Sequence, residues 1–393
     1  MTKPELLAPA GNLSKLKLAL YYGADAVYLG GKAFSLRSSA DNFTEEELEE
    51  GVRYAHARGK KVYVAANIFA KNADFPALEA LFRRLEALHA DGVLVSDLGV
   101  FRLAKRVAPR LPLHISTQAN TLNKEAAAFW YEQGARRVVL ARETTAEEIA
   151  EIHAAVPALE LEAFVHGAMC ISYSGRCYLS DYLEGRSSNR GACAQPCRYR
   201  FRLQAEGKEG WYDLEEDGKG SYLLNSKDLN MLAHLRELAA AGVSSFKIEG
   251  RTKGEYYLAT VVNAYRRAMD GGDTEMCSRE LLSAAHRAYT TAYDLKKGGQ
   301  SVETSQTSGT HAFIGLVTGH EKGRVFVEMR GRFFEGEELE IVSPSALFGK
   351  KIKVDALRDS ENNPCTDAKK VQEIYSFSCP YPLSQGDILR KKL

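Results

Sequence analysis

The 393-residue sequence lacks the segments of a secreted or membrane-spanning protein. Its first residues, MTKPELLAPAGN, have no charged segment followed by an apolar run, and no stretch approaches the roughly 18 apolar residues of a membrane span. Net charge is also missing, because 52 lysines and arginines nearly cancel 51 aspartates and glutamates. Overall charge therefore gives no sign of a nucleic-acid partner. These absences predict a cytoplasmic protein with no membrane partner.

Several catalytic motifs are missing as well. The sequence has no HExxH zinc-protease helix, no GxSxG nucleophile elbow and no glycine-rich phosphate loop ending in Lys-Ser or Lys-Thr. No dinucleotide-type GxGxxG follows the first expected strand. A hydrolase mechanism thus has no visible machinery.

What the sequence does contain is an alternation of short β-rich runs with longer helical patterns. Several of the amphipathic stretches between the runs close on a glycine, as helix C-caps do. Eight alternating units predict a closed TIM-like (β/α) barrel over residues 1–295, in preference to an open doubly wound sheet, which has a similar periodicity. The expected strands are 6–11, 26–30, 60–69, 92–97, 113–120, 136–143, 161–167 and 244–250.

The barrel pattern is interrupted once and then ends. Residues 168–243 form an expected insertion after the seventh strand, and residues 296–310, rich in Gly, Ser and Thr, form an expected linker. Residues 311–393 contain short alternating runs separated by turn residues, which predict a small all-β barrel domain.

Four of the seven cysteines lie together in the insertion. Cys170, Cys177, Cys193 and Cys197 follow the pattern C-x(6)-C-x(15)-C-x(3)-C. In a reducing cytosol, clustered cysteines are more often metal ligands or catalytic groups than disulfides. A structural zinc site has two tight cysteine pairs, and here only the last pair is tight, so the spacing favours an iron-sulfur cluster over zinc. Uncoordinated thiols are the third alternative.

Polar residues end many of the expected barrel strands, at the face where barrel enzymes place their sites. His114 and His166 are the candidates for proton or substrate contacts, and Lys247 and Glu249 follow the eighth strand. Ordinary hydrogen-bonding groups of loops are the alternative for each. The other strand-end polar residues are Asn67, Ser96, Asp97, Ser116, Gln118, Asn120, Arg142, Glu143 and Arg251.

Arginines recur beside the cysteines, and aromatic residues alternate with some of them in CRYRFR. Such a pattern can contact phosphates and stack on bases, although one solvated basic face of a strand gives the same pattern. RGRFF at 330–334 has the same two interpretations. The predicted RNA-binding or anion-binding residues are Arg186, Arg190, Arg198 and Arg200.

Four stretches together resemble the collagenase-like peptidases of unknown mechanism, peptidase family U32. The most specific is EAFVHGAMCISYSGRCYLSDYLEGRSSNRGACAQPCRYRF at 162–201. The others are ELLAPAGNLSKLKLALYYGADAVYLGGKAFSLR at 5–37, LLNSKDLNML at 223–232 and FKIEGRTKGEYYLATVVNAYR at 246–266. The resemblance extends over nearly the whole chain, including the β-rich tail.

This resemblance implies a function different from the family name. The well-understood members are iron-sulfur proteins of oxygen-independent hydroxylation, acting on RNA bases or on a quinone precursor. The cysteine motif and the C-terminal β domain resemble the tRNA branch, which converts the wobble uridine to 5-hydroxyuridine and depends on prephenate. A branch acting on a ribosomal RNA cytidine is usually longer, and the quinone branch works as a pair of short proteins.

The implied cofactor is a [4Fe-4S] cluster on the four cysteines, with prephenate as donor or co-substrate. The implied partners are tRNA, the iron-sulfur assembly machinery and a homologous partner subunit. Some relatives place a ligand cysteine directly after SKDL, where this chain has Asn230. Cys197 is therefore the expected fourth ligand, and three thiolates with one open iron are the alternative.

The resulting hypothesis places the cluster at the barrel mouth and a flipped-out uridine in the strand-end cavity. Extrusion of the base is required for chemistry on a ring atom of a folded RNA. The arginines would hold phosphates or the co-substrate, and His114, His166, Lys247 and Glu249 would be acid-base or anchoring groups. The rival classes are a true peptidase and a noncatalytic adaptor that presents RNA to another enzyme.

Overall fold

The computed structural model of the 393-residue chain describes residues 3–36, 41–199, 226–291 and 307–393. The chain divides into two compact units, each described here by itself. Most of the expected linker, and residues 200–225 of the expected insertion, lie outside the described residues. The first unit comprises Met1–Leu20, Ala24–Lys253 and His286–Thr307, and the second comprises Tyr21–Gly23, Gly254–Ala285 and Ser308–Leu393.

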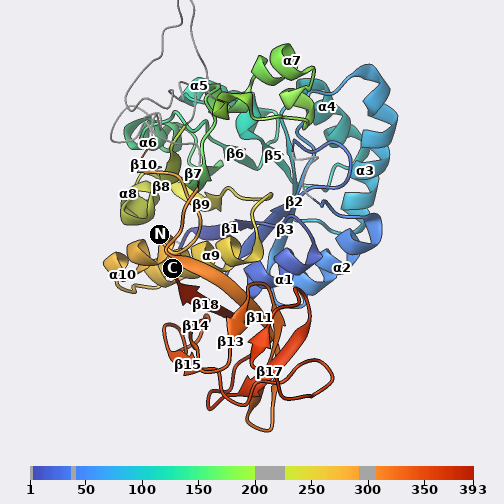
Figure 1. The fold of residues 1–393 in the computed structure, drawn as a ribbon. Helices are drawn as coiled ribbons and strands as arrows, with labels where there is room; N and C mark the ends of the chain where they lie inside the picture. The colour runs from blue at the N-terminus through green and yellow to red at the C-terminus, as the bar shows by residue number, and fades with distance from the viewer. Residues whose placement is uncertain (1–2, 37–40, 200–225, 292–306) are drawn as a thin grey trace, which may run out of the picture. The chain divides into compact units, whose positions relative to one another are not determined.

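Parallel strands close into a barrel in the first unit (Figure 1). Strands β1 to β7 pair in chain order, and β9 pairs with β7 on one side and with β1 on the other. Each of these eight strands overlaps an expected one, so the predicted TIM-like barrel is confirmed. The strands are β1 (Glu5–Pro9), β2 (Ala26–Leu29), β3 (Lys61–Ala65), β4 (Gly92–Val95), β5 (Leu113–Ile115), β6 (Arg137–Val139), β7 (Glu160–Ala168) and β9 (Val243–Ile248).

Helices connect the barrel strands, and side-chain caps fix where several of them begin. Thr44 and Thr145 form reciprocal capping boxes, and the Asp97 carboxylate accepts from the backbone N–H of Val100. The connecting helices are α1 (Leu13–Tyr21), α2 (Glu45–His56), α3 (Phe75–Ala87), α4 (Leu98–Val107), α5 (Lys124–Glu132), α6 (Ala146–Ala155) and α8 (Leu235–Ala240).

The expected insertion begins where β7 reaches the carboxyl end of the barrel. Its described part carries the short helix α7 (Leu179–Glu184) and then, beyond residue 225, strand β8 (Asp228–Asn230). Strand β8 pairs antiparallel with the end of β7, and β10 (Tyr289–Thr290) pairs with β8. The chain that carries the cysteines is thus anchored at the barrel end where TIM-barrel enzymes place their sites.

The interior of the barrel has an apolar layer and a charged layer. The charged layer centres on Arg137, whose guanidinium lies 2.8 Å from Glu5, 2.8 Å from Glu160 and 3.0 Å from Glu162. Burial opposes the charge of Arg137, but Glu162 and Glu5 raise its pKa above the ordinary value. Glu162 also binds the Lys247 ammonium at 2.6 Å. The apolar layer is Leu7, Ala26, Tyr28, Tyr63, Leu94 and Val139, with Phe164 packed against it.

The second unit joins two helices to an antiparallel sheet. Arg390 is buried and binds the carboxylates of Glu280 and Glu340, which connects α10 to the strands. The described pairings run β15-β14-β18-β11-β12-β17, with β13 and β16 as a separate pair. The predicted all-β domain is confirmed, with β15 and β17 at the edges of its main sheet. The elements are α9 (Glu255–Met269), α10 (Thr274–Leu281), β11 (His311–Glu321), β12 (Arg324–Met329), β13 (Phe333–Phe334), β14 (Glu338–Val342), β15 (Lys351–Lys353), β16 (Asp367–Ala368), β17 (Ile374–Ser378) and β18 (Ile388–Lys392).

Among the described residues, no helix combines the length and the apolar composition that crossing a bilayer requires.

The charged layer predicts a large effect of one substitution. Replacing Arg137 by Met removes the cation that three carboxylates share, so we expect the free energy of unfolding to fall by roughly 3–5 kcal/mol. Arg84→Met, in the exposed pair with Glu49, is the control, with an expected loss below about 1 kcal/mol. Urea unfolding followed by circular dichroism measures both. Equal losses in the two variants would contradict this account of the barrel.

Candidate functional site

A cavity of about 210 Å³ lies at the carboxyl ends of the barrel strands. Tyr28, Leu94, Val139, Phe164 and Lys247 reach it from inside the barrel, and polar residues that follow β3, β5, β6 and β9 extend its wall. Most of the remaining wall comes from residues 168–198, which we call the cysteine segment. The predicted position of the site, at the mouth of the barrel, thus coincides with a real cavity.

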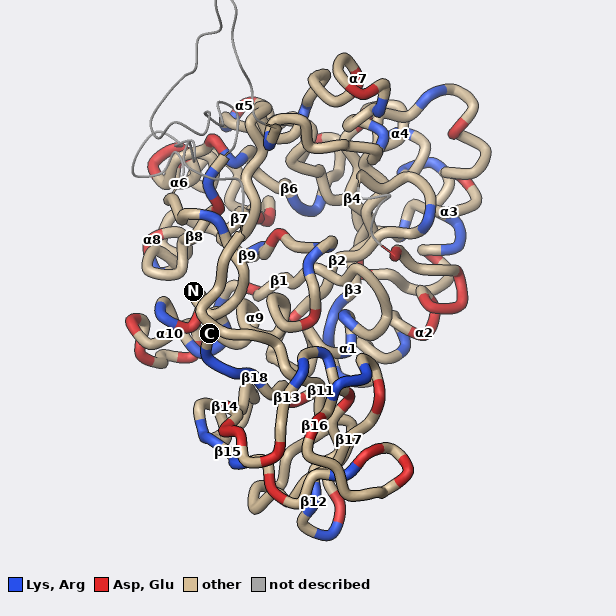
Figure 2. The backbone as a smooth tube through the Cα atoms, viewed as in Figure 1, with Lys and Arg blue, Asp and Glu red and all other residues tan. Residues whose placement is uncertain are grey.

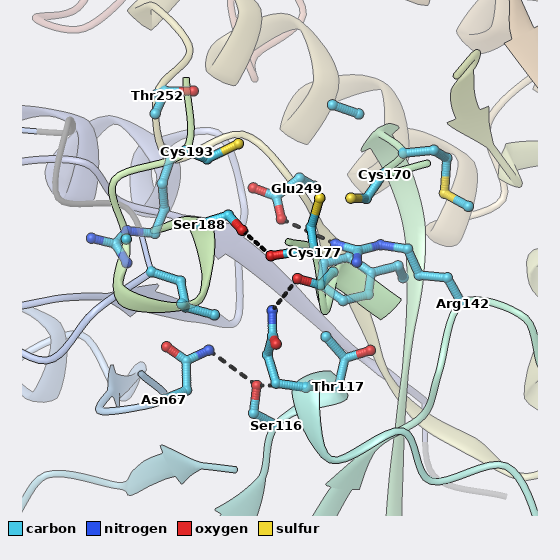
Figure 3. A pocket seen from close by; sticks show the side chains of 18 of the residues that line it. Asn67, Ser116, Thr117, Arg142, Cys170, Cys177, Ser188, Cys193, Glu249 and Thr252 are labelled. Atoms are coloured by element: carbon cyan, nitrogen blue, oxygen red, sulfur yellow. Dashed lines mark hydrogen bonds and ion pairs between the residues drawn. The ribbon is translucent and has the colours of Figure 1, made fainter. Parts of the chain in front are cut away.

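All four predicted ligand cysteines line this cavity. Figure 3 shows Cys170, Cys177 and Cys193 across the cavity from Asn67 and Ser116. Burial raises the pKa of Cys197 to about 11, and the neighbouring thiol groups of Cys170, Cys193 and Cys177 also contribute. Charge on any of these three sulfurs would therefore disfavour the thiolate form of Cys197.

The four thiols line one cavity but are not grouped around a single ion site. No three of the described His, Cys, Asp and Glu side chains are grouped closely enough to hold one metal ion. A four-iron cluster is larger, and each of its four thiolates binds a different iron, so its ligands stand farther apart. The backbone N–H of Gln195 donates to the Cys193 sulfur at 3.4 Å, the type of bond that tunes cluster sulfurs. The cluster expected on these four thiols remains a prediction.

Hydrogen bonds fasten the cysteine segment to the barrel loops. The Glu143 carboxylate accepts from the Ser174 backbone N–H at 2.8 Å and from its hydroxyl at 2.5 Å. The Arg176 guanidinium donates to the Gln118 carbonyl at 2.7 Å, and the Asn120 amide donates to the Tyr173 carbonyl at 3.2 Å. The loops after β5 and β6 thus hold the segment that connects the first two cysteines.

A second set of bonds fastens the segment between Cys177 and Cys193. Asn189 exchanges side-chain hydrogen bonds with the backbone of Cys177, and its carbonyl accepts from the Phe69 N–H at 3.0 Å. Arg190 donates to the Phe69 carbonyl at 2.7 Å and pairs with Asp74 at 2.9 Å. Arg190, predicted to bind RNA or an anion, is thus engaged in holding the loop.

Of the four predicted acid-base or anchoring residues, Lys247 and Glu249 line the cavity. The Lys247 ammonium lies 4.3 Å from the Tyr28 ring centroid and 5.4 Å from that of Phe164, besides its bond to Glu162. Glu249 pairs with Arg142 at 3.3 Å, as Figure 3 shows. The cavity floor thus presents a fixed cation between two aromatic rings.

The lining carries more positive than negative charge. Glu249 is the one carboxylate among the described lining residues, against Arg142, Arg198, Lys247, Arg251 and Lys253.

Two of these cations, Arg198 and Lys253, interact electrostatically. Burial lowers the pKa of Lys253, Asp228 opposes this shift, and Arg198 and Arg287 add to it. Burial and Arg287 likewise lower the pKa of Arg198, while Cys197 raises it. Asp228 itself is bound by Arg287 at 2.7 Å. An anion in this part of the cavity would relieve the repulsion among the cations.

The two predicted histidines do not line the cavity. His114 lies inside the barrel, with its ring centroid 4.8 Å from that of Tyr63, and its ring fills the space that a side chain at Gly92 would need. Burial, reinforced by Arg137, lowers the pKa of His114 well below its usual value. His166 is buried beside Tyr289, with ring centroids 5.5 Å apart. Their proposed acid-base roles remain predictions.

The other predicted RNA-binding residues are placed differently from one another. Arg186 is exposed, Arg198 lines the cavity, and Arg200 lies outside the described residues. In the second unit, the arginines of RGRFF are paired, Arg330 with Glu255 and Glu328, and Arg332 with Asp367. Acidic and basic residues are interspersed along both units (Figure 2).

Asn230, which stands where some relatives place a cysteine, does not line the cavity. Its side-chain oxygen accepts from the Leu232 N–H at 3.1 Å.

Sequence reasoning missed two features of the site. Lys253 lines the cavity from the chain after β9, and the sequence signal was its position two residues after Arg251. Exposed tyrosines on the cysteine segment were also missed, although YSGRCYLSDY shows three of them within ten residues. Tyr178 and Tyr182 are 67% and 74% exposed, and their ring centroids are 6.4 Å apart.

Comparisons with known proteins identify the family of this chain. The model of peptidase family U32 matches residues 11–304, and that of the U32 C-terminal domain matches residues 309–390. A Bacillus subtilis protein named tRNA hydroxylation protein P1 is 37% identical over 406 aligned positions, covering 99% of this chain and 95% of that protein.

Two other relatives match less of their own length. A 23S rRNA 5-hydroxycytidine synthase of Escherichia coli is 38% identical over 267 positions, covering 68% of this chain and 39% of that protein. A collagenase of Porphyromonas gingivalis is 33% identical over 277 positions, covering 68% and 65%. A solved structure of a U32 peptidase is 16% identical, covers 63% of this chain and 93% of that chain, and has a TM-score of 0.43.

The burial of His166 predicts an acid-sensitive fold. Burial lowers its pKa from 6.5 to about 3, so below pH 6.5 the unfolded chain binds a proton that the folded chain does not. The stability that neutral His166 contributes to the fold is therefore lost as pH falls from 6.5 toward 3. At pH 5 this loss is about 2 kcal/mol. Between pH 7.5 and pH 5, we expect the free energy of unfolding to fall by about 2 kcal/mol less in His166→Gln than in the wild type, as measured by urea unfolding. The control is His89→Gln at an exposed position, and an unchanged pH dependence in His166→Gln would refute the assignment.

Proposed function

The chain belongs to peptidase family U32. We propose that it hydroxylates tRNA, the activity that the names of its tRNA hydroxylation relatives state. It would convert the wobble uridine of tRNA to 5-hydroxyuridine without molecular oxygen. It would use a [4Fe-4S] cluster on Cys170, Cys177, Cys193 and Cys197, with prephenate as co-substrate. The iron-sulfur assembly machinery would load the cluster.

The observation that carries this proposal is likeness over the full length. The tRNA hydroxylation relative is matched over 95% of its own chain, whereas the ribosomal RNA relative is matched over 39% and the collagenase over 65%. The match to the tRNA relative includes the C-terminal β domain. Hydroxylation of tRNA is therefore favoured over the other two activities.

The cavity offers the parts that this chemistry needs. The four thiols could hold the cluster, which when bound would supply electron transfer next to the substrate. Replacing a ring hydrogen by a hydroxyl group removes two electrons from the base, so a co-substrate must donate oxygen or accept electrons. The proposal gives this role to prephenate, whose two carboxylates suit the positive lining around Arg198 and Lys253. Lys247 would anchor the base from the cavity floor.

The outer face of the cysteine segment suits RNA. Tyr178, Tyr182 and Arg186 are all exposed on this segment, and aromatic and arginine side chains together stack on bases and contact phosphates. In this proposal the tyrosine rings stack on the bases next to the extruded uridine, because extrusion leaves those bases without a stacking partner.

A peptidase is the second candidate, because the family name and the collagenase relative point to it. Cysteine peptidases need a thiol with a lowered pKa and an imidazole partner. Burial instead raises the pKa of Cys197, and no histidine is among the described lining residues. The cavity chemistry therefore favours hydroxylation.

Analysis of tRNA nucleosides tests the proposed activity. In cells that lack this gene, we expect 5-hydroxyuridine and its derivatives to be lost from tRNA and restored by the wild-type gene. Cys170→Ser should restore less than about one-tenth, because a cluster ligand is removed, whereas Cys365→Ser in the second unit should restore fully. Liquid chromatography with mass spectrometry measures the nucleosides. Normal hydroxyuridine in the deletion strain would rule out the activity.

The tyrosine pair predicts a separable effect on RNA binding. Stacking contributes about 1–3 kcal/mol per base, so Tyr178→Ala/Tyr182→Ala should bind an anticodon stem-loop at least about fivefold more weakly. The salt dependence should stay the same, because no charge is removed, whereas Arg186→Gln should reduce the salt slope by about 1. Fluorescence anisotropy measures both, with Tyr131→Ala as the exposed control. Wild-type affinity in the double variant would exclude these tyrosines from the RNA interface.

A further inference from the structure

We propose that the side-chain carbonyl oxygens of Gln118 and Asn67 recognise the ring N–H of the substrate base, and that Gln118 makes the site prefer uracil over cytosine. This inference rests on the proposed function and adds the residues that read the base. It follows from two buried acceptors that line one cavity.

Gln118 is the better defined of the two acceptors. Its side chain is 6% exposed and lines the cavity, and its Oε1 has no hydrogen-bond partner among the described residues. Its Nε2 donates to the Gly175 carbonyl at 3.4 Å. Rotating the amide by half a turn would place two carbonyl oxygens together, so this bond fixes Oε1 as the group left for a ligand.

Gly175 permits this arrangement. A side-chain carbon at Gly175 would lie 2.8 Å from Gln118 Nε2, and the backbone there has a φ of +83°. Both constraints require glycine. The Gln118 backbone carbonyl also accepts from Arg176 at 2.7 Å. The cysteine segment therefore sets the orientation of Gln118. Recognition of the base by Gln118 thus requires the cysteine segment to be folded in place.

Asn67 provides the second acceptor from the loop after β3. Its Nδ2 donates to the Ser116 hydroxyl at 3.0 Å, as Figure 3 shows, while its Oδ1 is buried without a partner among the described residues. The same hydroxyl lies 3.5 Å from the Gln118 backbone nitrogen. Ser116 thus connects the Asn67 carboxamide to the backbone of Gln118, and all three residues line the cavity. A buried acceptor left without a donor costs about 1–3 kcal/mol, which a donor on the ligand would recover.

The hydrogen-bonding edge of uracil matches this wall. Uracil presents one ring N–H between two carbonyl oxygens, so its complement is an acceptor flanked by donors. Gln118 and Asn67 supply acceptors, and Lys247 and Arg142 line the same cavity as cationic donors. Cytosine carries a lone pair on that ring nitrogen, so a fixed carbonyl oxygen would repel it. The site should therefore reject cytosine at this position.

Competition binding with two RNAs tests the inference. The probes are anticodon stem-loops with uridine or cytidine at the wobble position, bound anaerobically to the full-length protein. We expect the wild type to prefer the uridine RNA by at least about tenfold, and Gln118→Met, which keeps the side-chain volume, to bind both RNAs within about threefold. Asn67→Ala is a second, independent variant with the same expected direction. Gln133→Ala, exposed after α5, is the control that should keep the preference.

The outcomes separate this inference from the proposed function. If Gln118→Met keeps the full uridine preference, Gln118 does not read the base and the inference is wrong, although tRNA hydroxylation stands. A wild type that binds both RNAs equally also overturns the inference and leaves the hydroxylation proposal in place. A wild type that restores no hydroxyuridine to the deletion strain overturns the proposed function itself. Loss of the preference in Gln118→Met, with unchanged thermal unfolding and iron content, supports the inference, and the same loss in Asn67→Ala adds the second acceptor.

Discussion

The Arg137 guanidinium lies inside the barrel and binds carboxylates from β1 and β7 at once. An unpaired charge in a low-dielectric interior is costly. Separating any one of these strands from the barrel would leave buried charges on the remaining strands unpaired. Glu162 extends the same network to Lys247, whose ammonium forms part of the cavity floor. The interaction that holds the barrel together from inside therefore also fixes a cation at the site.

The cysteine segment depends on that frame. Its bonds go to loops that follow three different strands, through Asp74, Gln118 and Glu143. A segment of loops and short helical turns has little apolar surface of its own with which to offset its ordering entropy. The closed barrel supplies fixed anchor points instead, and brings together thiols that are 27 residues apart in sequence between Cys170 and Cys197.

The barrel and the cysteine grouping could be predicted from sequence because their signals are local. Each buried strand is a short apolar run between helical patterns, and the four cysteines fall within one segment. Arg137 and Glu162 could not be placed inside the barrel, because a charged residue in a strand is more often on the surface. The positions of His114 and His166 were unpredictable for a related reason: which face a strand-end residue takes depends on its neighbours. Asp228 and Arg287 are 59 residues apart in the sequence, so no local sequence pattern indicates that they form an ion pair.

We propose that the four thiols lining the cavity at the barrel mouth bind one iron-sulfur cluster. Iron and sulfide analysis of anaerobically purified protein, with optical and paramagnetic resonance spectra, tests it most directly. We predict about four irons and four sulfides per chain, lost in Cys170→Ala, Cys177→Ala and Cys193→Ala but kept in Cys365→Ala. Zinc in place of iron, or iron that persists in all of these variants, would contradict the account.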